Sequence, residues 1–241
     1  MKRKLIISAA VICSLLTIFL VVCRVTGMLQ FYVIPTPSSE PTIMQGEKVF
    51  SSSLKEPAAY NFIVFTSEYE DSVNMAYMPD LKAGSRYIHR LCGLPGDIIK
   101  MKNGTLYVNN KNFDAPLNLN NQYKISSAEF NLIEEADMEA MSKSAGAYMI
   151  SNDTGLVIFD SALLNKYSSK INPVLYITPY VEQGPFKWNN KNTWWTPDNF
   201  GPLKIPANCY FVVGDNRHNA LDSRYIGFVK KDDIKGVVLN K

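Results

Sequence analysis

The feature that most constrains this chain is a run of 19 residues, 5–23, that contains no charged side chain. As a helix this run would be about 28 Å long, which is close to the hydrocarbon thickness of a bilayer. Lys2, Arg3 and Lys4 precede the run, and Arg24 alone follows it closely. This excess of basic residues before the run predicts a cytoplasmic N-terminus, with everything after Arg24 across the membrane.

Two other interpretations of the run fit its sequence less well. A cleavable signal peptide usually has a shorter apolar core and ends in a pair of small residues, whereas Val21-Val22-Cys23 offers no such pair. A lipoprotein site ending at Cys23 is disfavoured by the bulky Val22 before it. We therefore expect residues 1–4 in the cytoplasm, an uncleaved signal anchor over 5–23 and an extracytoplasmic domain over 24–241.

The charge and the cysteines argue against two classes of function. The net charge of +3 comes from Lys2, Arg3 and Lys4 alone, because the other 22 basic and 22 acidic residues cancel. A nucleic-acid-binding domain normally carries a basic face on its folded part, so no nucleic-acid partner is expected. The four cysteines and two histidines show no metal-binding spacing, so we expect no metal and no cofactor. Whether Cys92 and Cys209 form a disulfide stays open.

Beyond the predicted anchor the pattern indicates a mostly β domain. Short β-rich runs bounded by Pro, Gly, Asn or Asp occur at residues 30–34, 60–65, 86–93, 209–213 and 236–239. Residues 98–108 predict a hairpin, because Asn103-Gly104 is a strong turn dipeptide. Residues 126–143 favour one or two short helices, and residues 183–202 a long loop. We expect an inserted second lobe, about residues 109–208, within a β core.

Three segments carry residues that chemistry could use. The only two histidines are His89, in a strand-like run, and His218, in a turn. Residues 34–43 place two serines between prolines, and a rigid loop can hold a nucleophilic hydroxyl in one place. Residues 214–227 crowd charged and amide groups into a turn after an apolar strand. Taken singly, each pattern is more often structural than catalytic.

Together, and in this order behind an apolar N-terminal run, the segments resemble the motifs of type I signal peptidases, the serine peptidase family S26. Residues 38–43 resemble S-M-x-P-T-L, residues 87–97 resemble Y-I-K-R-x-x-G-L-P-G-D, and residues 214–227 resemble G-D-N-R-D-N-S-x-D-S-R-Y-x-G. Residues 198–202 are also similar. The resemblance implies a signal-peptidase-like β core and a membrane-bound serine endopeptidase. Such an enzyme removes signal peptides from translocated preproteins after small residues, of the Ala-x-Ala type.

The resemblance assigns roles to single residues. It implies that Ser38 is the nucleophile, and that the Thr36 hydroxyl and the Ser38 backbone N–H form the oxyanion hole. It also implies a small apolar substrate pocket and a polar framework. The pocket positions are Ile34, Pro35, Ile43, Tyr87 and Ile88, and the framework positions are Arg90, Asp215, Arg217 and Arg224.

Two positions depart from the bacterial pattern in a chemically consistent way. His89 stands where bacterial members have a lysine base, and Ala220 where they usually have a serine that helps to hold the lysine amine. Histidine titrates near neutrality and needs one acceptor to fix its tautomer, whereas lysine must be buried to lose its proton. Asp222 could be that acceptor, which predicts a Ser38–His89–Asp222 triad. The use of histidine resembles the endoplasmic-reticulum type of signal peptidase.

Some expectations rest on the resemblance as a whole. His218 replaces a family aspartate and is expected to be a surface or network residue rather than the base. The expected partners are preprotein signal peptides, the lipid bilayer and the secretion translocon, at the cell inner (plasma) membrane. The alternative is a catalytically impaired relative that acts as a membrane-anchored binding module.

Overall fold

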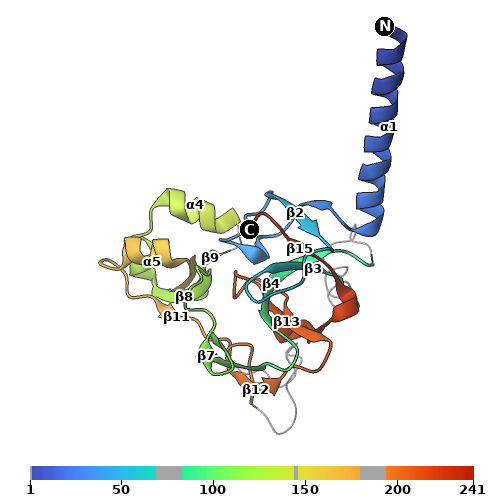
Figure 1. The fold of residues 1–241 in the computed structure, drawn as a ribbon. Helices are drawn as coiled ribbons and strands as arrows, with labels where there is room; N and C mark the ends of the chain where they lie inside the picture. The colour runs from blue at the N-terminus through green and yellow to red at the C-terminus, as the bar shows by residue number, and fades with distance from the viewer. Residues whose placement is uncertain (1, 69–82, 144–145, 180–193) are drawn as a thin grey trace.

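A computed structural model describes residues 2–68, 83–143, 146–179 and 194–241. The chain begins with helix α1 (Lys2–Thr26), which projects away from the rest of the molecule (Figure 1). Among the described residues, Ile6–Thr26 is the one stretch that is long and apolar enough to cross a membrane. The end of α1 is tied to the next elements, because the Ser53 backbone N–H donates to the Gly27 carbonyl at 2.9 Å.

A seven-stranded antiparallel sheet forms the centre of the molecule, in the order β1-β2-β15-β3-β4-β13-β14. Its strands are β1 (Gln30–Val33), β2 (Lys48–Ser52), β15 (Ile234–Val238), β3 (Phe62–Phe65), β4 (Tyr87–Gly93), β13 (Cys209–Val213) and β14 (Val229–Lys230). All four residues of β3 are buried. Phe62 and Val64 belong to one hydrophobic cluster and Ile63 and Phe65 to another, so both faces of the strand are covered.

A second, four-stranded sheet has the order β12-β5-β6-β7. It contains β12 (Phe200–Lys204), β5 (Ile98–Lys102), β6 (Thr105–Val108) and β7 (Lys111–Asn112). The predicted hairpin is confirmed, with Asn103 and Gly104 at φ values of 48° and 74° between β5 and β6.

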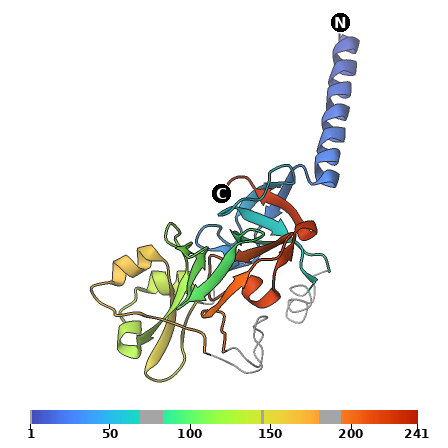
Figure 2. The same cartoon turned by 60° about the horizontal axis from the view of Figure 1, so that its bottom comes forward.

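A third sheet, β11-β8-β10-β9, forms a lobe with its own hydrophobic cluster. Its strands are β11 (Val174–Leu175), β8 (Asn121–Ser126), β10 (Thr154–Phe159) and β9 (Ala147–Met149). The helices α3 (Ser127–Phe130), α4 (Glu135–Lys143) and α5 (Ser161–Tyr167) accompany it. The expectation of one or two short helices over residues 126–143 is confirmed. Both views place this lobe on the opposite side of the body from α1 (Figures 1 and 2).

The expected fold class is confirmed: the described chain is mostly β, with one apolar N-terminal helix. The prediction of a loop over residues 183–202 is partly wrong, because β12 begins at Phe200 and pairs with β5. Pro202 hid this strand, since proline cannot donate to a ladder, and the register shifts between Phe200 and Leu203. Residues 183–193 of that expectation lie outside the described residues. The lobe boundaries of 109–208 stay a prediction; the sheet of the lobe spans residues 121–175.

Candidate active site

Ser38 lies in a short 3-10 turn, η1 (Pro37–Ser39), which follows β1. Pro37 stands at the start of η1, where its fixed φ favours a helical turn, and the extended residue Thr36 is the N-cap. The Ser38 side chain is half-buried, and its Oγ lies 3.3 Å from the Thr36 Oγ1. The Thr36 hydroxyl, predicted to help form the oxyanion hole, therefore lies beside the hydroxyl of the predicted nucleophile.

The loop that carries Ser38 is clamped to the sheet by buried polar contacts. The Arg90 guanidinium on β4 donates to both carboxylate oxygens of Asp215, with Nε at 2.7 Å, and to the Thr42 Oγ1 at 3.1 Å. Ser39 is 1% exposed and its Oγ donates to the Ile88 carbonyl at 2.9 Å. These contacts fix the chain on the C-terminal side of Ser38, as a pre-positioned nucleophile requires.

His89 lies on β4 and is 2% exposed, with its ring 5.8 Å from that of Phe65. Its Nε2 lies 3.1 Å from the Leu221 carbonyl oxygen. Because a carbonyl can only accept, this contact assigns the proton to Nε2 and the lone pair to Nδ1. An unprotonated Nδ1 is the form of the ring that can take a proton from a hydroxyl.

Gly214 is the point at which the two candidate catalytic segments meet. A Cβ at this residue would lie 2.6 Å from the Ser38 carbonyl oxygen and 3.4 Å from the His89 Nδ1, and would also overlap the Ala220 Cβ. The absence of a side chain at Gly214 thus lets the Ser38 loop, the His89 ring and Ala220 approach the same backbone atom. The Asn216 N–H closes the junction by donating to the Ser38 carbonyl at 3.1 Å.

Asp222 is fully buried at the N-cap of α6 (Ser223–Ile226), one residue after Leu221. Its carboxylate accepts hydrogen bonds from the Gly214 N–H at 3.0 Å and from the Arg224 backbone N–H, Nε and Nη2. Asp222 therefore ties α6 to the junction. At the His89 Nε2 the structure places the Leu221 carbonyl, and a backbone carbonyl leaves no residue-type signal by which sequence reasoning could find it.

Two arginines expected in the framework are buried among carboxylates. Arg217 is 2% exposed and donates through Nη1 and Nη2 to both oxygens of Asp114, with Nη1 at 2.6 Å. Burial lowers the pKa of the Arg217 guanidinium, but the charge and hydrogen bonds of Asp114 outweigh it and the pKa is raised. For Arg224 the charge of Asp222 likewise outweighs burial and raises the pKa. Both side chains therefore stay cationic and hold the segment 214–224 in place.

The five residues predicted to form a substrate pocket do not all lie together. Ile34, Ile43 and Ile88 share one hydrophobic cluster, next to the Ser38 loop. Tyr87 packs on the other side of β4, in the cluster that contains Phe65, as the alternation of side chains along a strand requires. Pro35 is exposed.

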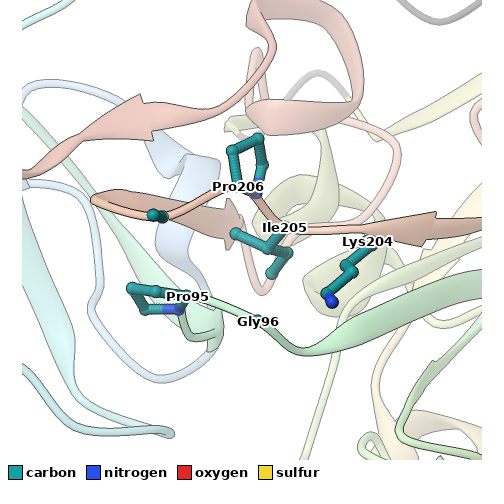
Figure 3. Close-up of a pocket in the computed structure, with 6 residues that line it drawn as sticks. Pro95, Gly96, Lys204, Ile205 and Pro206 are labelled. Atoms are coloured by element: carbon teal, nitrogen blue, oxygen red, sulfur yellow. The ribbon is translucent and has the colours of Figure 1, made fainter.

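A surface pocket of about 450 Å³ lies between the turn after β4 and the end of β12 (Figure 3). Its lining residues are Pro95, Gly96, Lys204, Ile205, Pro206 and Ala207, and none of them is a candidate catalytic residue. Cys92 and Cys209 are both free thiols, and burial raises the pKa of the Cys92 thiol, so it is not a nucleophile.

Comparison with known proteins gives one consistent result. The family model of signal peptidases, peptidase S26, matches residues 6–240. A signal peptidase I P of Bacillus subtilis subsp. natto is 25% identical over 229 residues, which are 95% of this chain and 83% of the relative. The signal peptidase I of Buchnera aphidicola subsp. Baizongia pistaciae (strain Bp) is 28% identical over 222 residues, which are 86% of this chain and 67% of the relative.

A crystal structure of a signal peptidase I from Enterococcus faecalis V583 covers 77% of this chain and 98% of its own, with 22% identity and a TM-score of 0.35. That superposition is too loose to bear on the position of any residue. The family match, by contrast, spans nearly the whole chain, from the apolar helix to the last strand. The chain belongs to the signal peptidase family, peptidase S26.

Proposed function

We propose that this protein is a membrane-bound serine endopeptidase that removes N-terminal signal peptides from translocated preproteins, cleaving after small residues of the Ala-x-Ala type. The observation that carries the proposal is the junction at Gly214, around which the Ser38 carbonyl and the His89 Nδ1 both lie. Family membership and the apolar helix α1 support the substrate class, since signal peptides are held in the membrane.

Ser38 and His89 divide the chemistry between them. As the Ser38 Oγ attacks the carbonyl carbon of the scissile bond, the His89 Nδ1 takes its proton and then gives it to the leaving amine. The bond to the new N-terminus breaks, and the signal peptide remains as an ester on Ser38. A water molecule, deprotonated by the same Nδ1, hydrolyses this ester and returns the hydroxyl to Ser38.

The developing oxyanion is stabilised by the Thr36 hydroxyl and the Ser38 backbone N–H. The 3.3 Å separation of the Thr36 Oγ1 and the Ser38 Oγ supports this role, because the donor must lie beside the attacking oxygen. The Ser38 N–H is in the first turn of η1, where backbone donors have no acceptor within the helix. Ile34, Ile43 and Ile88 would line the pocket for the small residues before the cut.

We assign Asp222 to the triad as a positioning member. The Leu221 carbonyl fixes the His89 tautomer, and the hydrogen bonds that Asp222 accepts from Gly214 and Arg224 hold that carbonyl in place. Histidine in the place of a lysine base is consistent with Ala220, whose methyl group lies at the same junction. An imidazole needs no hydroxyl there, whereas an ammonium would.

The proposed topology has residues 1–4 in the cytoplasm, the anchor over 5–23 and the peptidase domain over 24–241 outside the inner (plasma) membrane. The basic residues Lys2, Arg3 and Lys4, which precede the apolar run within α1, support this orientation. Its partners there are the lipid bilayer, preprotein signal peptides and the secretion translocon that delivers them.

The direct test is cleavage of a preprotein by the full chain in detergent, with the new N-terminus read by sequencing. Ser38→Ala and His89→Ala should each abolish cleavage while the thermal unfolding midpoint stays close to wild type. Wild-type protein that binds the preprotein but never cuts it would favour the alternative, a membrane-anchored binding module. Full activity in His89→Ala would disprove the assignment of the base.

A further inference from the structure

The second histidine, His218, is buried between the lobe and the segment that holds the candidate active site. Its side chain is 6% exposed. Its Nδ1 accepts a hydrogen bond of 3.2 Å from the Gln122 backbone N–H on β8. The ring also meets that of Tyr176, which follows β11, edge-on at 5.8 Å. Because Nδ1 accepts, the proton of a neutral His218 is on Nε2.

The Nε2 of His218 faces a buried carboxylate. It lies 3.4 Å from the Asp198 Oδ2, and the Asp198 side chain is 1% exposed. The Thr178 N–H also donates to this oxygen at 2.8 Å, while the other oxygen lies 3.8 Å from the Arg224 Nη1. Burial raises the pKa of the Asp198 carboxyl, but the adjacent His218 ring and the charge of Arg224 outweigh it, so the pKa is lowered. Asp198 is therefore a buried anion that lies against the His218 and Arg224 side chains.

The same arginine continues the chain of contacts to the active site. Arg224 donates through Nε and Nη2 to Asp222 at 2.9 and 2.8 Å. Asp222 accepts from the Gly214 N–H, and its neighbour Leu221 presents the carbonyl that the His89 Nε2 contacts. Every side chain in this series, from His218 through Asp198 and Arg224 to Asp222, is nine-tenths or more buried. Buried charges of this kind are costly to leave unmatched, so each member constrains the next.

We propose that His218 is a positioning residue that couples the lobe to the catalytic histidine, by joining Gln122 on the lobe to the Asp198–Arg224–Asp222 series behind His89. The proposal rests on the proposed function, because it assigns His89 as the base. It predicts that disturbing His218 alters the catalytic rate constant, although His218 does not touch the substrate. A residue that only filled space would alter stability alone.

Two variants remove the two contacts of His218 separately. His218→Asn keeps an acceptor near the Nδ1 position for the Gln122 N–H but is too short to reach Asp198. His218→Gln can extend a donor to Asp198 but loses the acceptor for Gln122. Because the coupling needs both contacts, each variant should lower kcat about threefold to thirtyfold while KM changes less than about twofold. Unchanged kcat in both variants would overturn the proposal.

A matched control is Tyr167→Phe, which removes a buried hydroxyl within the lobe. The Tyr167 hydroxyl donates to Asp137 at 2.6 Å and accepts from the Glu134 N–H at 2.9 Å. This variant should lower the unfolding midpoint without changing kcat. A loss of kcat in Tyr167→Phe as large as in the His218 variants would overturn the proposal, because any weakening of the lobe would then have the same effect.

Imidazole nitrogen NMR separates this inference from the proposed function, because it needs no activity. The chain has only two histidines, so ring-¹⁵N spectra of the wild-type protein in detergent should resolve both. The account predicts a bare Nδ1 on His218 and a shift of the His89 ring resonances in His218→Asn. A protonated Nδ1 on neutral wild-type His218 would overturn the inference, and this measurement needs no variant. His89 ring resonances that stay unchanged in His218→Asn would also overturn it. If the wild-type protein did not cleave a preprotein, that result would instead contradict the proposed peptidase function.

Discussion

At the scale of single residues, His89 differs from a lysine in how many hydrogen-bond partners its side chain needs to act as a base. The Leu221 carbonyl at 3.1 Å is enough to fix the tautomer of an imidazole. An ammonium has three donors to satisfy, and Ala220 offers only a methyl group at the junction where the Ser38 loop and the His89 ring meet. The histidine and the alanine therefore form one consistent pair.

This pairing predicts a poor result for a lysine in the same place. His89→Lys should lower kcat about 10²–10⁴-fold, the usual contribution of a general base, because its amine lacks a partner. Adding Ala220→Ser should recover part of that loss, whereas Ala220→Ser in the wild-type background should not raise activity. Steady-state cleavage of a signal-peptide substrate by the four proteins measures this. Full activity of His89→Lys alone would contradict the pairing.

Gly214 gives a second prediction at this scale. In Gly214→Ala the new Cβ would lie 2.6 Å from the Ser38 carbonyl, a backbone atom that cannot turn away. We expect a loss of stability of about 1–3 kcal/mol, as overpacking usually causes, together with a large loss of kcat because the Ser38 loop is displaced.

The control for this variant is Gly146→Ala, whose Cβ would lie 2.7 Å from the Ile158 Cδ1 in the lobe. It should reduce stability without a comparable loss of kcat. Urea unfolding and kcat, measured on the same preparations, give both quantities. Equal kcat values for Gly214→Ala and wild type would show that the junction at Gly214 does not position Ser38.

At the scale of elements, α6 is held by buried charges, and this makes stability depend on pH. The folded-state pKa of Asp198 is lowered from an ordinary value of 3.8, despite burial, by His218 and Arg224. A carboxyl whose pKa is lowered by folding stabilises the fold at pH values above its unfolded-state pKa. This stabilisation is lost as the pH falls toward the folded-state pKa. Asp198→Asn should therefore cost about 3–5 kcal/mol at neutral pH, the usual result of breaking a buried pair.

The difference in stability between wild type and Asp198→Asn should narrow below about pH 4, where the wild-type carboxylate begins to lose its advantage. Urea unfolding midpoints measured from neutral pH down into the acid range would show this. Asp153→Asn, at an exposed position, should differ little from wild type at any pH. A difference for Asp198→Asn that stays constant with pH would contradict the assignment of Asp198 as a buried anion.

The elements also show which structure a local pattern can reveal. Residues 209–213 were predicted as a strand, and β13 (Cys209–Val213) has those bounds, because an apolar β-rich run stopped by Gly214-Asp215 is complete in itself. The hairpin at Asn103-Gly104 was equally readable. β12 was not, because its pairing with β5 lies about 100 residues away and Pro202 interrupts its pattern.

At the scale of the whole molecule, the contacts between residues 114–122 and the segment 214–218 could not be predicted from the sequence. The Arg217 guanidinium donates to Asp114, and the Arg217 backbone N–H donates to the Asn120 carbonyl. The His218 ring accepts a hydrogen bond from the Gln122 backbone N–H. None of Asp114, Asn120 and Gln122 stood out before, since each contact depends on a long-range approach. Ser38, His89, Asp222 and Thr36 could be named because their motif positions resemble a family; the Leu221 carbonyl could not.

The topology of the molecule in the membrane can be tested with fusions. If Lys2, Arg3 and Lys4 are cytoplasmic and α1 crosses the membrane once, Lys241 lies outside the cytoplasm. Alkaline phosphatase fused after Lys241 in bacterial cells should be active, because it folds only outside the cytoplasm. A fluorescent protein that folds only inside should stay dark there. The reverse pattern would contradict the proposed orientation.

The central claim is that Ser38 is a nucleophile served by His89, and acylation of the chain by a serine-directed probe tests it most directly. The full chain in detergent is reacted with the probe, and the modified residue is located by peptide mapping. The account predicts labelling at Ser38 and not at Ser39, with a rate at least about 10²-fold lower in His89→Ala. Labelling at Ser39, or labelling of Ser38 at the same rate without His89, would contradict it.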